Sequence, residues 1–117
     1  MQVEPVSYLP LTEPTFYILL SLAPGKKHGY AILKDVEDLS NKSVSLSTST
    51  LYTAISRLLD QRLIERLPDE PEHNASPGLP RKVYGLTELG RRVLEAETQR
   101  LQNLITAARL RLRKESI

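Results

Sequence analysis

The stretch that decides the fold runs from Ser45 to Leu63 and reads SLSTSTLYTAISRLLDQRL. It predicts a helix, because the hydroxyl of Ser47 suits an N-terminal cap and apolar residues then recur at helical spacing. The apolar positions are Leu51, Ile55, Leu58 and Leu59. We therefore expect one face of this helix to be buried in a core.

The opposite face of the same helix has the composition of a DNA-reading surface. It carries short hydroxyl side chains and one cation, and no carboxylate precedes Asp60. Small hydroxyl residues allow close approach to the major groove, and arginine can bind a guanine edge or a phosphate. The predicted contacts are Ser49, Thr50, Thr53 and Arg57, with the hydroxyl of Tyr52 donated to a phosphate while its ring packs. An ordinary amphipathic surface helix would have a similar sequence. The neighbouring elements must therefore decide between a DNA-reading helix and an ordinary one.

Two helices are predicted before this one. Thr12 should cap the first, which has Pro14 in its first turn and ends at Pro24-Gly25. This helix is apolar nearly all round, so we expect it to be buried on more than one side, with the second side supplied by another subunit. The second helix follows Gly29, and Tyr30 is predicted to pack. Its predicted inner face is Ile32, Leu33, Val36 and Leu39. The second and third helices have the layout of a helix-turn-helix.

The residues after the third helix predict a wing. Segments 63–68 and 81–86 have the composition of strands, and residues 69–80 between them are rich in proline, asparagine, serine, glycine and acidic residues, as loops are. Acidic side chains in this loop would repel phosphates. We therefore expect the wing to touch the DNA backbone or minor groove through Arg81 and Lys82 of the returning strand.

Lys27 and His28 are further candidate contacts. They precede a predicted helix N-terminus, which itself attracts phosphate. The alternatives are a plain surface lysine at position 27 and, at position 28, a local hydrogen bond that orders the turn before Gly29.

The C-terminal part of the chain predicts one long helix. Thr87 should cap it, and it runs from Glu88 to about Lys114, roughly 40 Å at 1.5 Å per residue. A small winged core cannot cover that length, and the seven-residue spacing of some apolar positions is typical of a coiled coil. The predicted homodimer interface combines this helix with the first one and comprises Phe16, Tyr17, Leu20, Leu94, Leu101, Leu104, Ile105, Ala108 and Leu112.

These elements predict a mainly α fold with a small β-wing (α+β), a winged helix-turn-helix with a long C-terminal dimerisation helix. The predicted domains are an N-terminal arm at residues 1–11, the winged helix-turn-helix at 12–87 and the dimerisation helix at 88–117. A length of 117 residues fits this plan. The formal net charge of only +2 means that a nucleic-acid interpretation depends on where the cations lie.

Composition argues against several other classes of protein. There is no cysteine, which removes disulfides, thiol nucleophiles and cysteine-ligated zinc. No apolar run approaches the roughly 20 residues that span a membrane, and no signal segment opens the chain, so we expect a cytoplasmic protein. His28 and His73 have no nucleophile or ligand cluster around them. We expect no enzyme activity, no cofactor and no metal.

Three motifs in order resemble the PadR-like family of bacterial transcriptional regulators. They are His28-Gly29-Tyr30, Thr50-Leu51-Tyr52 with Arg57-Leu58, and Arg81-Lys82-Val83-Tyr84-Gly85-Leu86-Thr87 followed by Gly90. The resemblance implies a dimeric winged helix-turn-helix repressor that pairs through its first and last helices and leaves DNA when an effector binds. Length and the single last helix look like the smaller subgroup of that family.

Three departures from the family pattern limit what carries over. Ser49 and Arg62 stand where the family commonly has glycine, and Arg62 leaves the exit of the third helix without its easiest left-handed residue. Multidrug-binding members stack flat aromatic drugs between tryptophans, whereas this chain has no tryptophan. That ligand mode is therefore not carried over.

The sequence thus predicts a transcriptional regulator, which we expect to be a repressor. It should bind a pseudo-palindromic site on double-stranded DNA as a homodimer and be released by an unknown effector. Two alternatives stay open. One is a winged-helix module that binds protein and not DNA, which the low net charge and acidic loop favour. The other is a sensor of small aromatic molecules with its pocket at the dimer interface.

Overall fold

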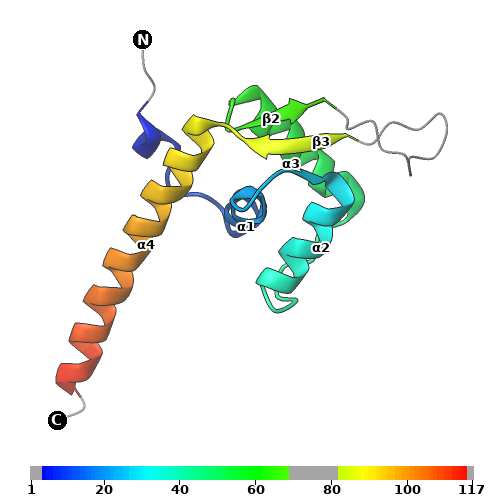
Figure 1. The fold of residues 1–117 in the computed structure, drawn as a ribbon. Coiled ribbons are helices and arrows are strands. Elements are labelled where there is room, and N and C mark those ends of the chain that lie inside the picture. The colour runs from blue at the N-terminus through cyan, green and yellow to red at the C-terminus, as the bar shows by residue number, and fades with distance from the viewer. Residues whose placement is uncertain (1–3, 69–81, 116–117) are drawn as a thin grey trace.

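The chain folds into a mainly helical winged helix-turn-helix from which one long helix projects (Figure 1). The computed structural model describes residues 4–68 and 82–115. In chain order the elements are η1 (Pro5–Tyr8), α1 (Glu13–Leu22), β1 (Lys27–His28), α2 (Gly29–Leu39), α3 (Thr48–Asp60), β2 (Ile64–Leu67), β3 (Val83–Leu86) and α4 (Glu88–Glu115). The predicted fold class is confirmed.

Hydroxyl side chains cap three of the helices at the predicted positions. Thr12 accepts from the backbone N–H of Thr15 at the start of α1, and Ser47 accepts from that of Thr50 at the start of α3. Thr87 accepts from the N–H of Gly90 at 2.9 Å. Each cap satisfies a backbone donor that the first turn of a helix leaves unpaired.

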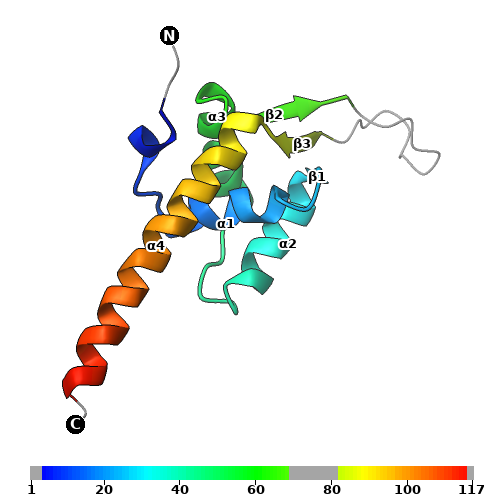
Figure 2. The ribbon, with the colours of Figure 1, turned by 60° about the vertical axis from the view of Figure 1, so that its left-hand side comes forward.

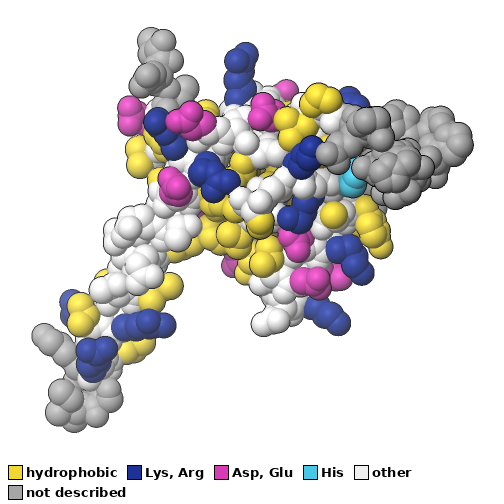
Figure 3. Space-filling model, in the orientation of Figure 1, with side chains coloured by type: hydrophobic (Ala, Val, Ile, Leu, Met, Phe, Trp, Pro, Cys, Tyr) yellow, Lys and Arg dark blue, Asp and Glu magenta, His cyan; other side chains and the backbone are white. Residues whose placement is uncertain are grey.

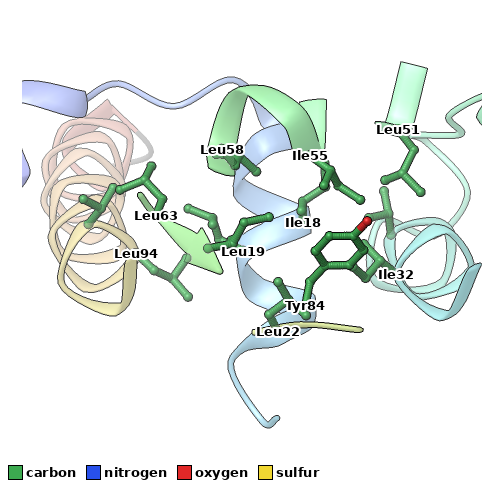
Figure 4. Packing of buried hydrophobic residues seen from close by; sticks show 13 residues of the cluster. Ile18, Leu19, Leu22, Ile32, Leu51, Ile55, Leu58, Leu63, Tyr84 and Leu94 are labelled. Carbon is green, nitrogen blue, oxygen red and sulfur yellow. The ribbon is translucent and has the colours of Figure 1, made fainter. Parts of the chain in front are cut away.

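The hydrophobic core surrounds α1. Ile18, Leu19 and Leu22 of α1 are almost completely buried, and Figure 4 shows them between α3, α4 and Tyr84 of β3. α2, α4 and β3 of the same chain all contact α1. The expectation that another subunit must supply the second side of α1 is therefore wrong for most of the helix. The buried face predicted for α3 is confirmed at Leu51, Ile55 and Leu58.

The sheet contains a strand that the sequence did not predict. The strand order in the sheet is β1-β3-β2, and both strand pairs are antiparallel. The two residues of β1 pair with Tyr84 and Val83 of β3, and β2 pairs with β3 from Ile64 to Leu67. In Figure 2 the pair β2–β3 lies above α1 and α2. The predicted wing loop at 69–80 lies outside the described residues, apart from the strands at its base.

The N-terminal segment is packed against α4. Tyr8, Leu9 and Leu11 lie against the core, and η1 contacts α4. The buried carboxylate of Glu97 accepts from the N–H of Leu11 at 2.9 Å and from both Nε (2.6 Å) and Nη2 (2.9 Å) of Arg100. Hydrogen bonding to Arg100 is the main cause that lowers the pKa of Glu97, against the opposing effect of burial. Residues 4–11 are thus attached to the rest of the chain.

Two apolar predictions for α2 are wrong. Tyr30 is 70% exposed, because 100° per residue places it on the side of α2 opposite the buried Ile32. Leu39 is on the same side as Ile32 but is also exposed, since it is the last residue of a helix that extends past the core.

The exit of α3 is bonded directly to the start of α4. Arg62 adopts the left-handed conformation, with φ 63°. The Thr87 hydroxyl donates toward the carbonyl oxygens of Arg62 (2.7 Å) and Leu63 (3.1 Å), and the latter also accepts from the N–H of Thr87. A Cβ on Gly90 would lie only 1.9 Å from the Leu63 oxygen, so only glycine permits this approach. The junction fixes α3 relative to α4.

Candidate nucleic-acid interface

The exposed face of α3 forms a ridge between two open hollows. Ser49, Thr53 and Arg57 follow one another at four-residue spacing and line both hollows. One hollow is completed by Tyr52, Ser56 and Asp60 of α3. The other includes Thr12, Pro14 and Thr15 at the start of α1, with Thr50 and Ala54. We define Ser49, Thr53 and Arg57 as the α3 ridge. A ridge of this kind is the part of a helix that can enter a groove of DNA.

Arg57 is the cation of this ridge. Its side chain is exposed and makes no hydrogen bond or ion pair with any other residue in the described part of the chain. A guanidinium in this state can donate to two acceptors on one guanine or to a phosphate without first breaking a protein contact. Asp60 lies one turn beyond Arg57, and its negative charge would repel DNA phosphates at that end of the ridge.

Tyr52 links α3 to the start of α2. Its hydroxyl lies so close above Gly29 that a Cβ at that position would be 2.2 Å away. Tyr84 lies nearby, and burial is the main cause that raises its pKa, with a smaller contribution from Tyr52. The contact with Gly29 fixes Tyr52 at the junction of the two helices, and the ring remains 42% exposed.

Lys27 is placed differently from the prediction. Its ammonium group donates to the carbonyl oxygen of Ser21 at 2.7 Å and lies 3.7 Å from the carboxylate of Asp35. Asp35 in turn accepts from the hydroxyl of Ser21 at 2.9 Å. This charge is used to join β1 to α1 and α2. It is therefore a poor candidate for a phosphate contact.

His28 directly precedes α2, as its motif predicted, and it lies in the unpredicted strand β1. Its Nδ1 atom is buried and has no hydrogen-bond partner in the described structure, so this nitrogen does not make the local hydrogen bond that was the alternative prediction. Lys82, just before β3, is exposed, whereas Arg81 lies outside the described residues.

Arg66 is a basic residue that the sequence analysis missed. It is exposed on β2 and pairs in register with Tyr84, where its charge acts to lower the pKa of Tyr84. Directly opposed residues share a face of the sheet, so the position of Tyr84 beside Tyr52 also brings Arg66 toward α3. Strand alternation would have shown the face of Arg66, but not its nearness to α3.

Residues 18–96 match the family described as "Transcriptional regulator PadR-like family". The match covers more than half of the sequence, including the α3 ridge and the base of the wing. The chain belongs to the PadR-like family.

Solved structures of this family share the fold. A PadR family transcription regulator from Clostridium difficile has a TM-score of 0.68 and 26% identity, over 86% of this chain and 99% of that one. A PadR-like regulator from Bacillus cereus has a TM-score of 0.67 and 23% identity, over 84% and 89%. PadR of Bacillus subtilis, solved in complex with operator DNA, has a TM-score of 0.63 and 24% identity, over 74% of this chain and 47% of that one. A comparison with curated protein sequences finds no match.

The residues predicted for a PadR-like dimer interface fall into two groups. Leu94 is only 6% exposed and belongs to the core of its own chain, so it was wrong to place it in an interface with a second copy. Phe16, Tyr17 and Leu20 of α1 are half-buried against the same core, and the rings of Phe16 and Tyr17 meet edge to face at 6.0 Å. These α1 residues are only partly available to another molecule.

The distal half of α4 is different, because its predicted interface residues are exposed, except for Leu101 at its beginning, which is half-buried. Leu104, Ile105 and Leu112 are 55%, 44% and 66% exposed, and Ala108 is exposed as well. At 100° per residue, Leu101, Leu104, Ile105, Ala108 and Leu112 lie on one side of the helix; we call them the α4 stripe. Leu110 is also exposed but lies on the opposite side. Figure 3 shows this end of α4 projecting from the domain with apolar and basic side chains.

Across residues 4–68 and 82–115, no helix is long and apolar enough to cross a bilayer. The same residues contain no group of three or more histidine, cysteine, aspartate or glutamate side chains that could hold a metal ion.

Proposed function

We propose that this PadR-like protein is a sequence-specific DNA-binding repressor that acts as a homodimer on a pseudo-palindromic operator. The observation that carries the proposal is the α3 ridge, where Arg57 is exposed at the end of a row of short hydroxyl residues and its side chain makes no hydrogen bond or ion pair in the described part of the chain. Such a surface suits the major groove, in which arginine pairs with guanine and small side chains allow close approach. The Bacillus subtilis relative solved with operator DNA supports the same mode of binding.

Contacts to the DNA backbone are proposed on both sides of the ridge. Lys82 and Arg66, at the base of the wing, are exposed cations that can neutralise phosphates. Tyr52 and Thr50 flank the ridge, and their hydroxyls can donate to phosphate oxygens. Such contacts position a protein on the duplex without reading the bases. Lys27 is not included, because its ammonium group is bonded within the chain.

Dimerisation is proposed through the α4 stripe, with Phe16, Tyr17 and Leu20 contributing from α1. Exposed leucine and isoleucine at helical spacing favour a partner helix over water. Two copies would then present two α3 ridges to half-sites about one helical turn, roughly 34 Å, apart. An effector that changes the pairing, such as a small aromatic molecule bound near Phe16 and Tyr17, would release the DNA.

Selection of bound DNA from a random library tests this function. We expect enrichment of one sequence with dyad symmetry and half-sites centred about 10 base pairs apart. Enrichment of a single, non-repeated site would contradict the dimer. The absence of any enriched sequence would contradict operator binding altogether.

The alternatives are separated by two simple measurements. A protein-interaction module, which the net charge of +2 favours, would not be retained on heparin or duplex DNA in a salt-dependent way. The proposed regulator should be retained and should elute earlier as salt rises, because phosphate contacts release counterions. A sensor that does not bind DNA would be stabilised by aromatic compounds in a thermal-shift screen and would show no salt-dependent retention on duplex DNA.

A further inference from the structure

The hydroxyl protons at the start of α3 are unequally available. Ser47 donates to the Thr50 hydroxyl oxygen at 2.8 Å, so Thr50 keeps its own proton for another acceptor. Thr53 donates to the backbone oxygen of Ser49 at 2.9 Å, so its proton is used within the helix. The Thr53 oxygen can therefore only accept from an outside group. The two threonines offer different chemistry to a ligand.

The same bond fixes what Thr53 shows to a ligand. Its oxygen is held toward the carbonyl of the preceding turn, and besides Cα and this oxygen the Cβ carries only a methyl group. Because Thr side chains take staggered positions, the methyl is directed away from that carbonyl. Thr53 is exposed and stands between Ser49 and Arg57 on the α3 ridge, in both of the hollows. The ridge thus presents an apolar methyl beside a hydrogen-bond acceptor.

This pair of groups matches one type of base pair. In the major groove an A·T pair offers the thymine methyl group together with the N6 amino donor of adenine. A G·C pair offers an amino donor on cytosine but no methyl group. Only the A·T pair satisfies both features of Thr53, whereas the five donors of Arg57 suit guanine or phosphate.

We propose that Thr53 is a specificity-determining residue that selects an A·T pair in each half-site by packing its methyl group on that of thymine. The inference rests on the proposed function, since it requires that α3 enters the major groove. It goes further by naming which base pair one residue reads and which atoms read it.

Replacing thymine by uracil, one position at a time, tests the methyl contact in the operator obtained by selection. The parent protein should bind about fourfold more weakly when one particular thymine of each half-site loses its methyl, the effect of about one buried methyl group. Thr53→Ser, which removes the protein methyl, should abolish the difference between thymine and uracil at that position. Thr53→Val, which keeps a methyl and removes the hydroxyl, should retain it.

Thr98 on α4 provides a matched control. Its hydroxyl makes the same kind of bond, to the backbone oxygen of Leu94 at 2.8 Å, and lies away from the α3 ridge. Thr98→Ser and Thr98→Val should therefore reproduce any general effect on folding and leave the response to uracil unchanged.

The outcomes distinguish failure of the proposed Thr53 contact from failure of operator binding itself. If uracil has no effect at any position, or if Thr53→Ser keeps the full penalty at the sensitive thymine, Thr53 does not read that methyl and the inference is overturned. If the parent enriches no sequence at all, the proposed function fails first. A penalty that disappears in Thr53→Ser and persists in Thr53→Val establishes the contact, because the two methyl deletions are then not additive.

Discussion

The α3 ridge and the α4 stripe are both exposed helical surfaces, yet they differ in every other respect. The ridge has short polar side chains and one free cation on a helix whose other face is fixed in the core. The stripe has large aliphatic side chains on the part of α4 that extends beyond the domain. Exposure of leucine and isoleucine at regular spacing costs free energy in water, whereas exposure of serine, threonine and arginine does not.

This contrast indicates that the two surfaces bind different kinds of partner. A surface that is stable in water can bind and leave a polar ligand such as DNA. A surface that is unfavourable in water calls for a permanent partner, and we propose that a second copy of the chain supplies a matching stripe. We expect substitutions on the two helices to separate DNA affinity from assembly.

The largest effect is expected from charges placed on the α4 stripe. Leu104→Glu together with Ile105→Glu should convert the proposed dimer to a monomer, because two carboxylates from each chain would be buried against their counterparts. Operator affinity should fall by at least about 100-fold, since a monomer loses the gain of binding two half-sites at once. Light scattering after gel filtration and an electrophoretic shift assay would measure the two effects.

A matched variant controls for the added charge. Asn103→Glu with Thr106→Glu adds the same charge on the opposite side of α4 and should remain a dimer. If both double variants were dimeric, the stripe would not be the interface.

Loss of the Arg57 side chain should come next in size. Arg57→Ala is expected to weaken binding to the operator by about 1–3 kcal/mol, with thermal stability little changed because the exposed Arg57 side chain makes no hydrogen bond or ion pair in the described chain. An electrophoretic shift series would measure this. Arg92→Ala, on α4, removes an exposed arginine that pairs with Glu88 at 3.4 Å and should leave affinity intact. Unaltered affinity of Arg57→Ala would exclude the ridge as the reading surface.

Glu97 tests whether α4 is fixed where it leaves the domain. Glu97→Gln should destabilise the chain by about 1–2 kcal/mol at pH 7, because charged hydrogen bonds to Leu11 and Arg100 become neutral or are lost. The folded-state pKa of Glu97 is lowered from 4.5, so its contribution is present above that pH and is lost as pH falls through the lower folded value. The difference between parent and variant in thermal melts should therefore shrink on acidification.

Glu95 provides the comparison for that experiment, as an exposed carboxylate on the same helix. Glu95→Gln should change stability little at any pH. A constant difference between parent and Glu97→Gln from pH 7 to pH 3 would show that the charge of Glu97 is not what stabilises the arm.

The smallest effect is expected at the exit of α3. Arg62→Gly should stabilise the fold by about 0.5–1 kcal/mol, because glycine adopts a positive φ without the strain of a Cβ, less its larger entropy when unfolded. Urea denaturation would measure the gain. Lys42→Gly, at a second left-handed residue (φ 67°), should give a similar gain. Destabilisation by Arg62→Gly would mean that contacts of the arginine outweigh its backbone strain.

Local signals in the sequence predicted the helices and their caps well. Ser47, Thr12 and Thr87 are predictable as caps because each hydroxyl accepts from a backbone N–H only three residues further along the chain. The buried face of α3 followed from the spacing of Leu51, Ile55 and Leu58 in the same way. The exposed ridge was predicted as the complement of that face. None of these inferences needs knowledge of which elements pack together.

Features that depend on tertiary contacts were missed. β1 has two residues, too few for any alternation, and exists because β3 lies beside it. Lys27 looked like a surface lysine, since nothing local indicates that Ser21 and Asp35 meet it. The role of Glu97 was not predicted, because its partner, the backbone N–H of Leu11, lies 86 positions away in the chain. Leu94 fits the periodicity of the stripe, but periodicity cannot show where the core ends.

Because Thr87 is bonded to the exit of α3, the 28-residue α4 and the α3 ridge should move together as one rigid unit. A tilt of about 5° acting over roughly 40 Å displaces the far end by about 3.5 Å, close to the distance between stacked base pairs. In the proposed dimer, a slight change in the angle between the two α4 helices would move the two α3 ridges out of register with their half-sites. Each domain would keep its internal structure.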